Sequence, residues 1–337
     1  MRILVTGGSG FIGTNLVAHF LETNVSFRNL DRAEPKLESH RPHWIRCDIL
    51  ERRRLVEELA QYQPTCVIHL AARTDVEGKS LDDYHTNTAG TTNVLQAIRN
   101  TRSVERLVIT STQYVNQYNG CPKHDEDYAP HTVYGQSKVI AEQLTRQANL
   151  RCVWTIVRPT NIWGPWHPRY PFEFWRTLAG GLYLHPGTVS VLRAYGYVGN
   201  VVYQLMRILD APKEKVHGRV YYLGDPPIDL FEWVNGFSLS QTGRRVKVAP
   251  RKLVAALAIV GDLLKLASIR FPITSSRFKN MITENGAPMG PTFELCGAGP
   301  YALEQGIQAT TDWMRKVHPG LVKVQNRLPS RGQLGCS

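Results

Sequence analysis

Cysteine is scarce in this sequence, and its six cysteines show no spacing that would mark a functional cluster. No two of them form a C-x-x-C pair, which argues against a zinc site and against a dithiol redox motif. Cys47 and Cys66 lie in apolar, strand-like runs, where a thiol behaves as a small apolar side chain. Dispersed thiols fit a reducing compartment, so we expect a cytoplasmic protein without a bound metal.

Long hydrophobic runs are also missing. The longest, Leu253 to Val260, is followed by Gly261 and Asp262 and is shorter than the roughly 20 residues that span a bilayer. Basic residues flank the run, so it could lie on a membrane surface. We expect instead a helix packed on its own protein. No charged leader precedes the apolar run at Ile3, and we expect no secretory signal.

Acidic residues are outnumbered, 28 against 40 Lys and Arg, which gives the 337-residue chain a net charge of +12. A basic balance attracts anionic partners, and nucleic acid is the first candidate. However, the basic residues look scattered apart from Arg52-Arg53-Arg54, and no nucleic-acid-binding module is recognisable. That run begins an amphipathic pattern and is interpreted as a solvated helix face. A phosphorylated small substrate or an anionic membrane explains the charge equally well, and we expect no nucleic-acid partner.

Over residues 1–160, short β-rich runs alternate with helical patterns. This alternation predicts βαβ units and therefore an α/β fold, a Rossmann-type doubly wound parallel sheet with helices on both faces. The expected strands are Ile3–Thr6, Val25–Leu30, Trp44–Cys47, Thr65–Leu70, Arg106–Thr110 and Val153–Val157, and the expected helices are Phe11–Leu21, Arg52–Gln61, Thr88–Asn100 and Tyr134–Ala148.

The composition changes after Pro159. Residues 160–200 are rich in Pro, Gly and aromatic residues, which suggests ordered loops lining a pocket rather than regular core. Short strands follow at Val220–Leu223 and Val246–Val248, and a helix at Tyr301–Lys316 ends the pattern. The chain is long enough for two lobes. We expect a first domain over 1–160 to which elements from 190–225 return, a smaller substrate-binding lobe over 161–330, and a flexible tail over 331–337.

A glycine-rich turn, T-G-G-S-G-F-I-G, joins the first strand to the first helix. Its first glycine permits a tight turn, its second lets the backbone approach a pyrophosphate, and its third lets helix and strand pack closely. The helix N-terminus then offers backbone N–H groups to the phosphates. In this strand–turn–helix setting the motif predicts a dinucleotide site. The residues expected to hold the dinucleotide here are Gly7, Gly10, Phe11, Ile12 and Gly13.

Asp31 closes the second strand, 18 residues after Gly13. A carboxylate there accepts hydrogen bonds from the adenosine ribose and repels a 2′-phosphate, which favours NAD over NADP. Arg32 is the opposing clue, because its guanidinium could meet a 2′-phosphate. We expect NAD as the cofactor.

Tyr134 and Lys138 lie four residues apart in the helical pattern after the fifth strand, and therefore on one helix face. A nearby ammonium and a cationic nicotinamide ring both favour the phenolate form of a tyrosine. Tyr134 could then take a proton from a substrate hydroxyl while the same carbon gives a hydride to the nicotinamide. Thr112 follows the fifth strand, where a hydroxyl could pass the proton on or merely cap the strand.

These motifs together resemble the extended short-chain dehydrogenase/reductase superfamily, in its NAD-dependent nucleotide-sugar epimerase/dehydratase family. The resemblance covers most of the chain and implies a catalytic triad of Thr112, Tyr134 and Lys138. Segments that resemble family motifs include D-I, L-A-A, N-T-A-G-T-T-N and R-P-T-N-I-W-G-P. They imply further cofactor contacts or supporting positions at Asp48, Ile49, Leu70, Ala71, Ala72, Asn87 and Pro159.

The same resemblance implies a substrate diphosphate held by Asn161 and by Arg193, whose guanidinium suits phosphate oxygens. It also implies a homodimer built from helices 88–100 and 134–148, although the apolar residues on these helices could equally be intramolecular core. The apolar residues in question are Val94, Leu95, Ile98, Ile140 and Leu144.

The sequence departs from the family at two places. Gln113 and Tyr114 stand where sugar 4,6-dehydratases carry acidic residues, which disfavours dehydration of the sugar. The resemblance also implies that Gln113 contacts the substrate. Gly199 and Asn200 replace a family pair of acids, so the hinge there is expected to differ. Segment 238–294 matches no family feature.

The leading hypothesis is an NAD-dependent 4-epimerase of a nucleotide-diphosphate sugar, as in polysaccharide biosynthesis. The alternative is an NAD(P)-dependent dehydrogenase or ketoreductase of a keto-sugar or hydroxysteroid-like substrate. A third is a non-catalytic NAD sensor, against which the intact triad argues.

Overall fold

The computed structural model describes residues 1–117, 122–170, 174–266, 268–269 and 271–322. The chain divides into two compact units. Unit 1 comprises residues 1–166, 192–228 and 284–302, and unit 2 comprises 167–191, 229–283 and 303–337. The predicted tail at 331–337 lies outside the described residues.

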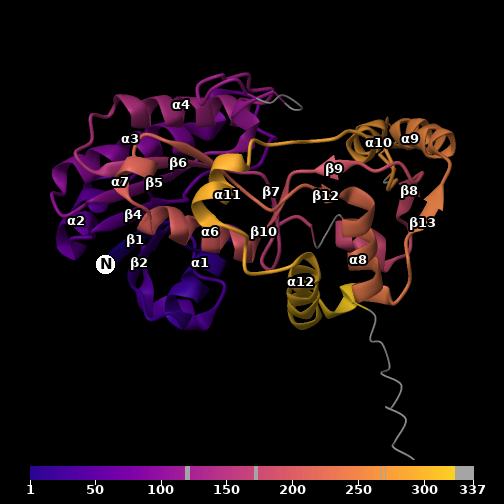
Figure 1. Ribbon diagram of the computed structural model, residues 1–337, viewed down its shortest axis with the longest axis horizontal. Helices are drawn as coiled ribbons and strands as arrows, with labels where there is room; N and C mark the ends of the chain where they lie inside the picture. The colour runs from indigo at the N-terminus through magenta and orange to yellow at the C-terminus, as the bar shows by residue number, and fades with distance from the viewer. Residues whose placement is uncertain (118–121, 171–173, 267, 270, 323–337) are drawn as a thin grey trace, which may run out of the picture. The chain divides into compact units, whose positions relative to one another are not determined.

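Unit 1 is built on a seven-stranded sheet with the strand order β11-β6-β5-β4-β1-β2-β3 (Figure 1). All of its strand pairs are parallel. The strand order reverses between β1 and β4, which is the switch point where Rossmann folds bind dinucleotides. The predicted fold class is confirmed. The strands are β1 (Arg2–Thr6), β2 (Ser26–Asp31), β3 (Trp44–Arg46), β4 (Cys66–His69), β5 (Arg106–Thr110), β6 (Val153–Pro159) and β11 (Val220–Leu223).

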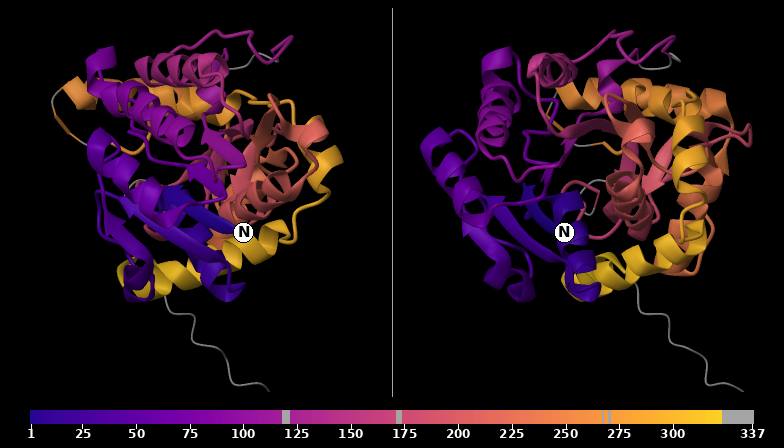
Figure 2. Two further views of the ribbon diagram at one scale, coloured as in Figure 1. Left: turned by 90° about the vertical axis from the view of Figure 1, so that its left-hand side faces the viewer. Right: turned by 60° about the vertical axis from the view of Figure 1, so that its left-hand side comes forward.

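Helices cover both faces of this sheet. Helices α2, α3 and α4 pack side by side on one face, and α1 packs against α6 on the other (Figures 1 and 2). The helices of unit 1 are α1 (Phe11–Glu22), α2 (Arg52–Tyr62), α3 (His85–Asn100), α4 (Val133–Gln147), α6 (Val198–Asp210), α7 (Lys213–Val216) and α11 (Gly290–Cys296). The shorter elements are η1 (Glu38–His43), η2 (Leu81–Tyr84), η3 (Gln113–Val115), β7 (Asn161–Trp163), β9 (Leu192–Arg193) and β10 (Tyr195–Tyr197), and β12 (Ile228–Asp229) straddles the unit boundary.

Every strand and helix predicted for residues 1–160 is present, with bounds within three residues. The largest shift is at α3, which begins at His85 rather than Thr88. The chain there is already helical, because η2 runs directly into α3 and Ser80 and Asp83 form a capping box at its start. Arg53 is exposed and pairs with Glu57 at 2.9 Å, which confirms the solvated helix face predicted for the arginine run.

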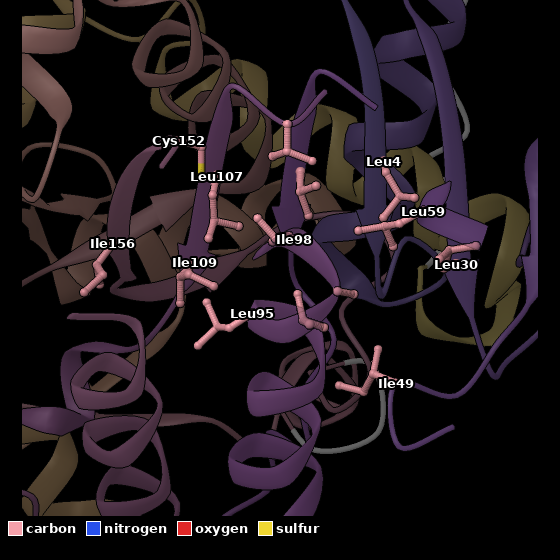
Figure 3. Packing of buried hydrophobic residues seen from close by; sticks show 14 of the residues in the cluster. Leu4, Leu30, Ile49, Leu59, Leu95, Ile98, Leu107, Ile109, Cys152 and Ile156 are labelled. Atoms are coloured by element: carbon pink, nitrogen blue, oxygen red, sulfur yellow. The ribbon is translucent and has the colours of Figure 1, made fainter. Parts of the chain in front are cut away.

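The core of unit 1 lies between the sheet and its helices. Leu95 and Ile98 of α3 pack with Leu107 and Ile109 of β5 (Figure 3). Val94, Leu95 and Ile98 are all buried inside unit 1, so these three residues belong to the intramolecular core rather than to a dimer interface. Ile140 and Leu144 of α4 are half-buried, and the homodimer stays a prediction.

The described cysteines behave as small apolar residues, as predicted. Cys47 and Cys66 are buried free thiols without a disulfide, and burial raises the pKa of the Cys47 thiol to about 11. Cys121 and Cys336 lie outside the described residues.

Unit 2 is mainly helical. Its helix α8 packs against α5 and α12, and its strands β8 and β13 pair in parallel. The elements of unit 2 are α5 (Phe174–Ala179), β8 (Leu184–Pro186), α8 (Leu230–Thr242), β13 (Lys247–Ala249), α9 (Arg251–Leu266), α10 (Ser275–Ile282), α12 (Leu303–Val317) and η4 (Pro319–Leu321).

The aromatic residues that follow Pro159 are core to a larger extent than predicted. Trp175 is fully buried in unit 2, with its ring 5.5 Å from that of Phe237. Trp163 is fully buried in unit 1, 5.1 Å from the ring of Tyr197. The expectation of pocket-lining loops is therefore wrong for these two tryptophans, because ring-to-ring packing keeps their large apolar surfaces from water.

Helix α9 packs on its own protein through one face only. Val254, Ala258 and Gly261 are buried on that face, against Ile273 and its neighbours. Its other face exposes large apolar side chains, so the prediction of a packed helix holds for half of its surface. Among the described residues, no helix is long and apolar enough to cross a membrane.

Candidate active site

The glycine turn between β1 and α1 depends on close backbone approach. Gly7 has a φ of +81°, and a Cβ atom there would lie 2.5 Å from the Ala71 nitrogen. A Cβ atom at Gly13 would lie 2.3 Å from the Gly7 carbonyl oxygen. Gly10 caps α1 without a side chain, and a Cβ there would meet only the Gly7 oxygen, at 3.2 Å. The turn therefore brings the N-terminus of α1 close to the ends of β1 and β4, and helix N-termini of this kind offer backbone N–H groups that suit phosphates.

Asp31 ends β2 beside this turn. Its carboxylate accepts the backbone N–H groups of Ser9 and Ala33, each at 2.9 Å. Burial raises the pKa of Asp31, against the lowering effect of these hydrogen bonds. Arg32 is 69% exposed and lies 3.9 Å from a carboxylate oxygen of Asp48. The structure thus fixes the Asp31 carboxylate at the glycine turn and leaves Arg32 mostly in solvent.

The other predicted cofactor residues fall into two groups. Leu70, Ala71 and Ala72 follow β4 at the turn and are half-buried. The side chain of Ile49 is buried in the core of unit 1 and packs against Gly90, so it contributes to the core. Pro159 ends β6 and is buried.

Asn87 joins three segments around the site. Its amide oxygen accepts the backbone N–H of Arg73 at 2.8 Å, and its amide nitrogen donates to the Arg73 carbonyl at 3.0 Å. The same nitrogen donates to the Ser137 hydroxyl of α4 at 2.9 Å. Asn87 therefore connects α3, the chain after β4 and the helix that carries Tyr134.

The Tyr134–Lys138 pair is buried on α4, which Thr132 caps by accepting the Gly135 N–H at 2.9 Å. The Lys138 ammonium donates to the Thr110 carbonyl at the end of β5, at 2.8 Å. Burial lowers the pKa of Lys138 to about 8, against the raising effect of the Glu142 carboxylate one turn further on. The hydrogen bond to β5 therefore places Lys138 at the carboxyl edge of the sheet.

Thr112 lies at the same edge, almost fully buried. Its hydroxyl accepts the Tyr114 N–H at 3.3 Å and caps η3. The Tyr114 ring lies edge-on to that of Tyr134, with centroids 6.2 Å apart. Thr112 therefore caps η3, as the alternative interpretation predicted. The segment that carries its hydroxyl packs next to α4.

A small cavity adjoins this segment, and sequence reasoning missed most of its polar lining. It is lined by Gln113, Tyr114, Asn116, His131, Tyr222 and Asn285, among others. In the part of the chain that the structure describes, the Gln113 amide nitrogen and the amide oxygens of Asn116 and Asn285 are buried and have no hydrogen-bond partner. The Thr110 and Ser111 hydroxyls share that state. Buried polar atoms need polar partners, and a cavity this small has room beside them for a water molecule or a single hydroxyl group.

Asn161 lies near Arg193 in the backbone, since its N–H donates to the carbonyl of Ala194, the residue after Arg193, at 3.3 Å. β7 pairs with β10 so that Asn161 stands opposite Tyr195, two residues after Arg193. Arg193 is 5% exposed, and its guanidinium lies over the Tyr195 ring at 5.7 Å. An isolated β-bridge joins Arg193 to Asn285. The backbone therefore places both predicted diphosphate ligands near one segment, residues 193–195, and Arg193 is also bridged to a cavity residue.

Asn200 has a defined role where the family carries an acid. Its amide nitrogen donates to the Asp225 carboxylate at 2.7 Å and to the Tyr301 carbonyl at 2.9 Å, and its oxygen accepts the Tyr301 N–H at 3.0 Å. Burial raises the pKa of Asp225 to about 6. A carboxylate at position 200 could not donate a hydrogen bond to Asp225. The amide of Asn200 can, and it thereby links Asp225 to Tyr301.

A fully buried ion pair lies behind the site. Arg158 of β6 donates two hydrogen bonds to Glu142 of α4, at 2.9 and 2.7 Å, and neither side chain is exposed. Arg158 also donates to the Tyr222 hydroxyl at 2.9 Å, and the Tyr128 hydroxyl donates to Glu142 at 2.9 Å. Asn116 donates a further hydrogen bond to Tyr222. Burial alone would lower the pKa of Arg158, but the hydrogen bonds to Glu142 raise it above its usual value.

Comparison with known proteins places this chain in a family. The model of the NAD dependent epimerase/dehydratase family matches residues 3–224. The chain therefore belongs to that family, which confirms the predicted resemblance and the predicted NAD cofactor.

Two curated proteins and one solved structure are similar over nearly the whole chain. An N-acetyl-α-D-glucosaminyl-diphospho-ditrans,octacis-undecaprenol 4-epimerase of Escherichia coli O157:H7 is 26% identical over 93% of this chain and 95% of its own length. A 2-alkyl-3-oxoalkanoate reductase of Stenotrophomonas maltophilia is 34% identical over 91% of this chain and 98% of its own length. The UDP-glucose 4-epimerase of Thermotoga maritima is similar in fold, with a TM-score of 0.70, 20% identity, and coverage of 94% of this chain and 99% of that one.

Gly13→Ala tests the cofactor turn. The added Cβ would lie 2.3 Å from backbone at Gly7 and 2.6 Å from backbone at Gly8, so we expect the free energy of unfolding to fall by about 1–3 kcal/mol. NAD affinity is expected to fall as well, measured by fluorescence titration beside urea unfolding. Gly290→Ala is the control, since its Cβ would meet nothing within 4 Å. Equal effects of the two substitutions would contradict the close-packing argument.

Glu142→Gln tests the buried ion pair. It keeps the shape of the side chain and leaves the Arg158 charge without a counter-charge, so we expect a loss of about 3–5 kcal/mol in urea unfolding. The double variant Glu142→Leu/Arg158→Met removes both charges and is expected to recover most of that loss. A single-variant loss under about 1 kcal/mol would show that the pair does not carry this stability.

Proposed function

We propose that this protein is an NAD-dependent 4-epimerase of a diphosphate-linked sugar, in the first instance a nucleotide sugar. The proposal combines the family, the buried Tyr134–Lys138 pair and the polar lining of the neighbouring cavity. The E. coli relative is named for a sugar on a polyprenyl diphosphate, so the carrier of the diphosphate is part of what has to be tested.

The residues present fit the cofactor. Gly7, Gly10 and Gly13 form a cradle that side chains would fill, and the first turn of α1 can hold the pyrophosphate. Asp31 would hold the adenosine ribose, and Lys138 would hold the nicotinamide ribose. When bound, NAD would accept a hydride from a ring carbon of the sugar and later return it.

The chain itself supplies proton transfer and orientation. Tyr134 takes the proton of the C4 hydroxyl as that carbon is oxidised, and gives it back on reduction. Lys138, charged and buried, favours the phenolate form of Tyr134. Thr112 would orient the reacting oxygen, while Asn161 and Arg193 would hold the diphosphate.

The observation that carries the choice of substrate is the set of unpartnered buried polar atoms around the cavity. A sugar can satisfy amide and hydroxyl groups through its own hydroxyls, whereas a hydrocarbon substrate would leave them unpaired at a cost of about 1–3 kcal/mol each. Gln113 and Tyr114 are not acids, which favours epimerisation over elimination of water.

Net reduction of a ketone is the second candidate. It is favoured by the reductase of Stenotrophomonas maltophilia, which is 34% identical over nearly its full length. The same Tyr134–Lys138 pair serves this reaction in the opposite direction, since Tyr134 would then donate its proton to the new alkoxide.

Epimerisation is tested by incubating the protein with a panel of UDP- and GDP-sugars and catalytic NAD. We expect new anomeric signals in proton NMR spectra without accumulation of NADH. Tyr134→Phe should lower kcat by about 10²–10⁴-fold and leave NAD affinity unchanged. No turnover across the panel, or stoichiometric NADH with one substrate, would contradict the epimerase.

The pH dependence tests the role of Lys138. Because burial lowers the pKa of Lys138 to about 8, its positive charge is present below that pH and is lost above it. We therefore expect kcat/KM to fall above about pH 8 as a single proton is lost. The residual activity of Lys138→Met should lack this alkaline limb. An unchanged limb in that variant would assign the titration to another group.

A further inference from the structure

Helix α9 presents an apolar stripe that none of the described residues of unit 2 covers. Ile259, Leu263 and Leu266 follow one another at spacings of four and three residues and are 60%, 61% and 85% exposed. Leu253 and Val260 flank them on the same side, half in solvent. Residues at such spacings share one helix face. An exposed stripe of this size marks a surface that binds another apolar phase.

The opposite face of α9 is already used, which fixes the direction of the stripe. Val254 and Ala258 are fully buried in a small cluster with Ala249 and Ile273. A Cβ atom at Gly261 would lie 1.8 Å from the Ile273 carbonyl oxygen, so the chain passes tightly behind the helix there. The exposed stripe therefore points away from the body of unit 2 and does not arise from a loosely placed helix.

Most of the excess positive charge of the chain lies in this one region. Residues 244–282 contain nine Lys and Arg and a single acid, a net charge of +8 out of +12 for the whole chain. The expectation that basic residues are scattered is thus wrong. The acid, Asp262, accepts the Ser275 N–H between α9 and α10.

Exposed cations lie at both ends of the helix that carries the stripe. Arg251 and Lys252 precede it, Lys265 lies near its end, and all three are exposed. Helix α10, which packs beside α9, adds exposed Arg277 and Lys279 (Figure 1). An apolar helix face bordered by cations matches the boundary between the acyl chains and the anionic headgroups of a bilayer. The 16 residues of α9 are too short to span it.

We infer that the α9–α10 pair (residues 251–282) docks this protein on the surface of an anionic lipid bilayer, with α9 lying in the interface. The charge distribution favours this occupant over a second copy of the chain, because two such surfaces, each with a net charge of +5 over residues 251–282, would repel each other. The inference does not depend on the reaction proposed above, since it concerns a surface that the reaction does not use.

The test is co-sedimentation of the full-length protein, loaded with NAD, with vesicles of phosphatidylcholine that contain or lack phosphatidylglycerol. We expect binding to the anionic vesicles only, weakened by added salt. Ile259→Glu and Leu263→Glu should each weaken it at least tenfold. Lys252→Gln should weaken it about fivefold, the share of one cation near such a surface.

Val317→Glu on α12 is the matched control, because Val317 is 42% exposed and lies in a helix outside the α9–α10 pair. It should bind vesicles as the unaltered protein does, and all variants should keep their thermal midpoints and NAD affinity. Equal binding by Leu263→Glu and the unaltered protein would overturn the inference. So would a dimer in light scattering that Leu263→Glu converts to a monomer without any preference for anionic vesicles.

Discussion

Arg158 and Glu142 face each other inside unit 1 with neither side chain reaching water, so each charge depends on the other for its stabilisation. Such a pair is tolerated only where the remaining donors and acceptors are also satisfied. Here the Tyr128 hydroxyl, the Tyr222 hydroxyl and the Asp125 carbonyl complete the set. The pair therefore fixes α4 to β6 and β11 with little freedom to slide or rotate.

The positions of Tyr134 and Lys138 follow from this constraint. Tyr134, Lys138 and Glu142 are spaced four residues apart on α4, so the anchor at Glu142 fixes the rotation of the helix that aims the other two. The Lys138 ammonium is held in turn by its hydrogen bond to the carbonyl of Thr110, at the end of β5. The segment of α4 that carries Tyr134 and Lys138 is thus held to the sheet at two points, through Lys138 to β5 and through Glu142 to β6.

The sequence predicts much of unit 1 because its signals are local. The glycine turn, the strand periodicity and the Tyr134–Lys138 spacing all act within one or two elements, and each is where it was expected. Asn285 is different: it reaches the cavity only because its backbone pairs with Leu192 and Ala194, far away in the sequence. No local pattern encodes that pairing, and the same holds for the junction of Asn200 with Asp225 and Tyr301.

Unit 2 was harder to predict for another reason. Hydrophobic periodicity shows that a helix has an apolar face, but α9 is apolar nearly all round. Such a pattern is typical of a buried helix, and only the structure separates the packed residues Val254 and Ala258 from the exposed Ile259 and Leu263. In the same way, a count of tryptophans cannot separate a pocket lining from the ring-to-ring core that Trp175 forms.

Epimerisation and ketone reduction would both use Tyr134 for proton transfer. Sequence identity to relatives that catalyse one or the other therefore does not decide between them. The reductase relative is the more identical of the two full-length matches, yet both lie in the range where one family supports several chemistries. The proposal rests on the cavity, where Gln113, Asn116 and Asn285 contribute buried amide atoms to a lining that also includes the exposed His131. A substrate that leaves them unpaired loses binding for each one, and a sugar hydroxyl can both donate and accept. The polar lining of the cavity therefore favours a sugar substrate, whether a nucleotide or a polyprenyl group is linked to its diphosphate.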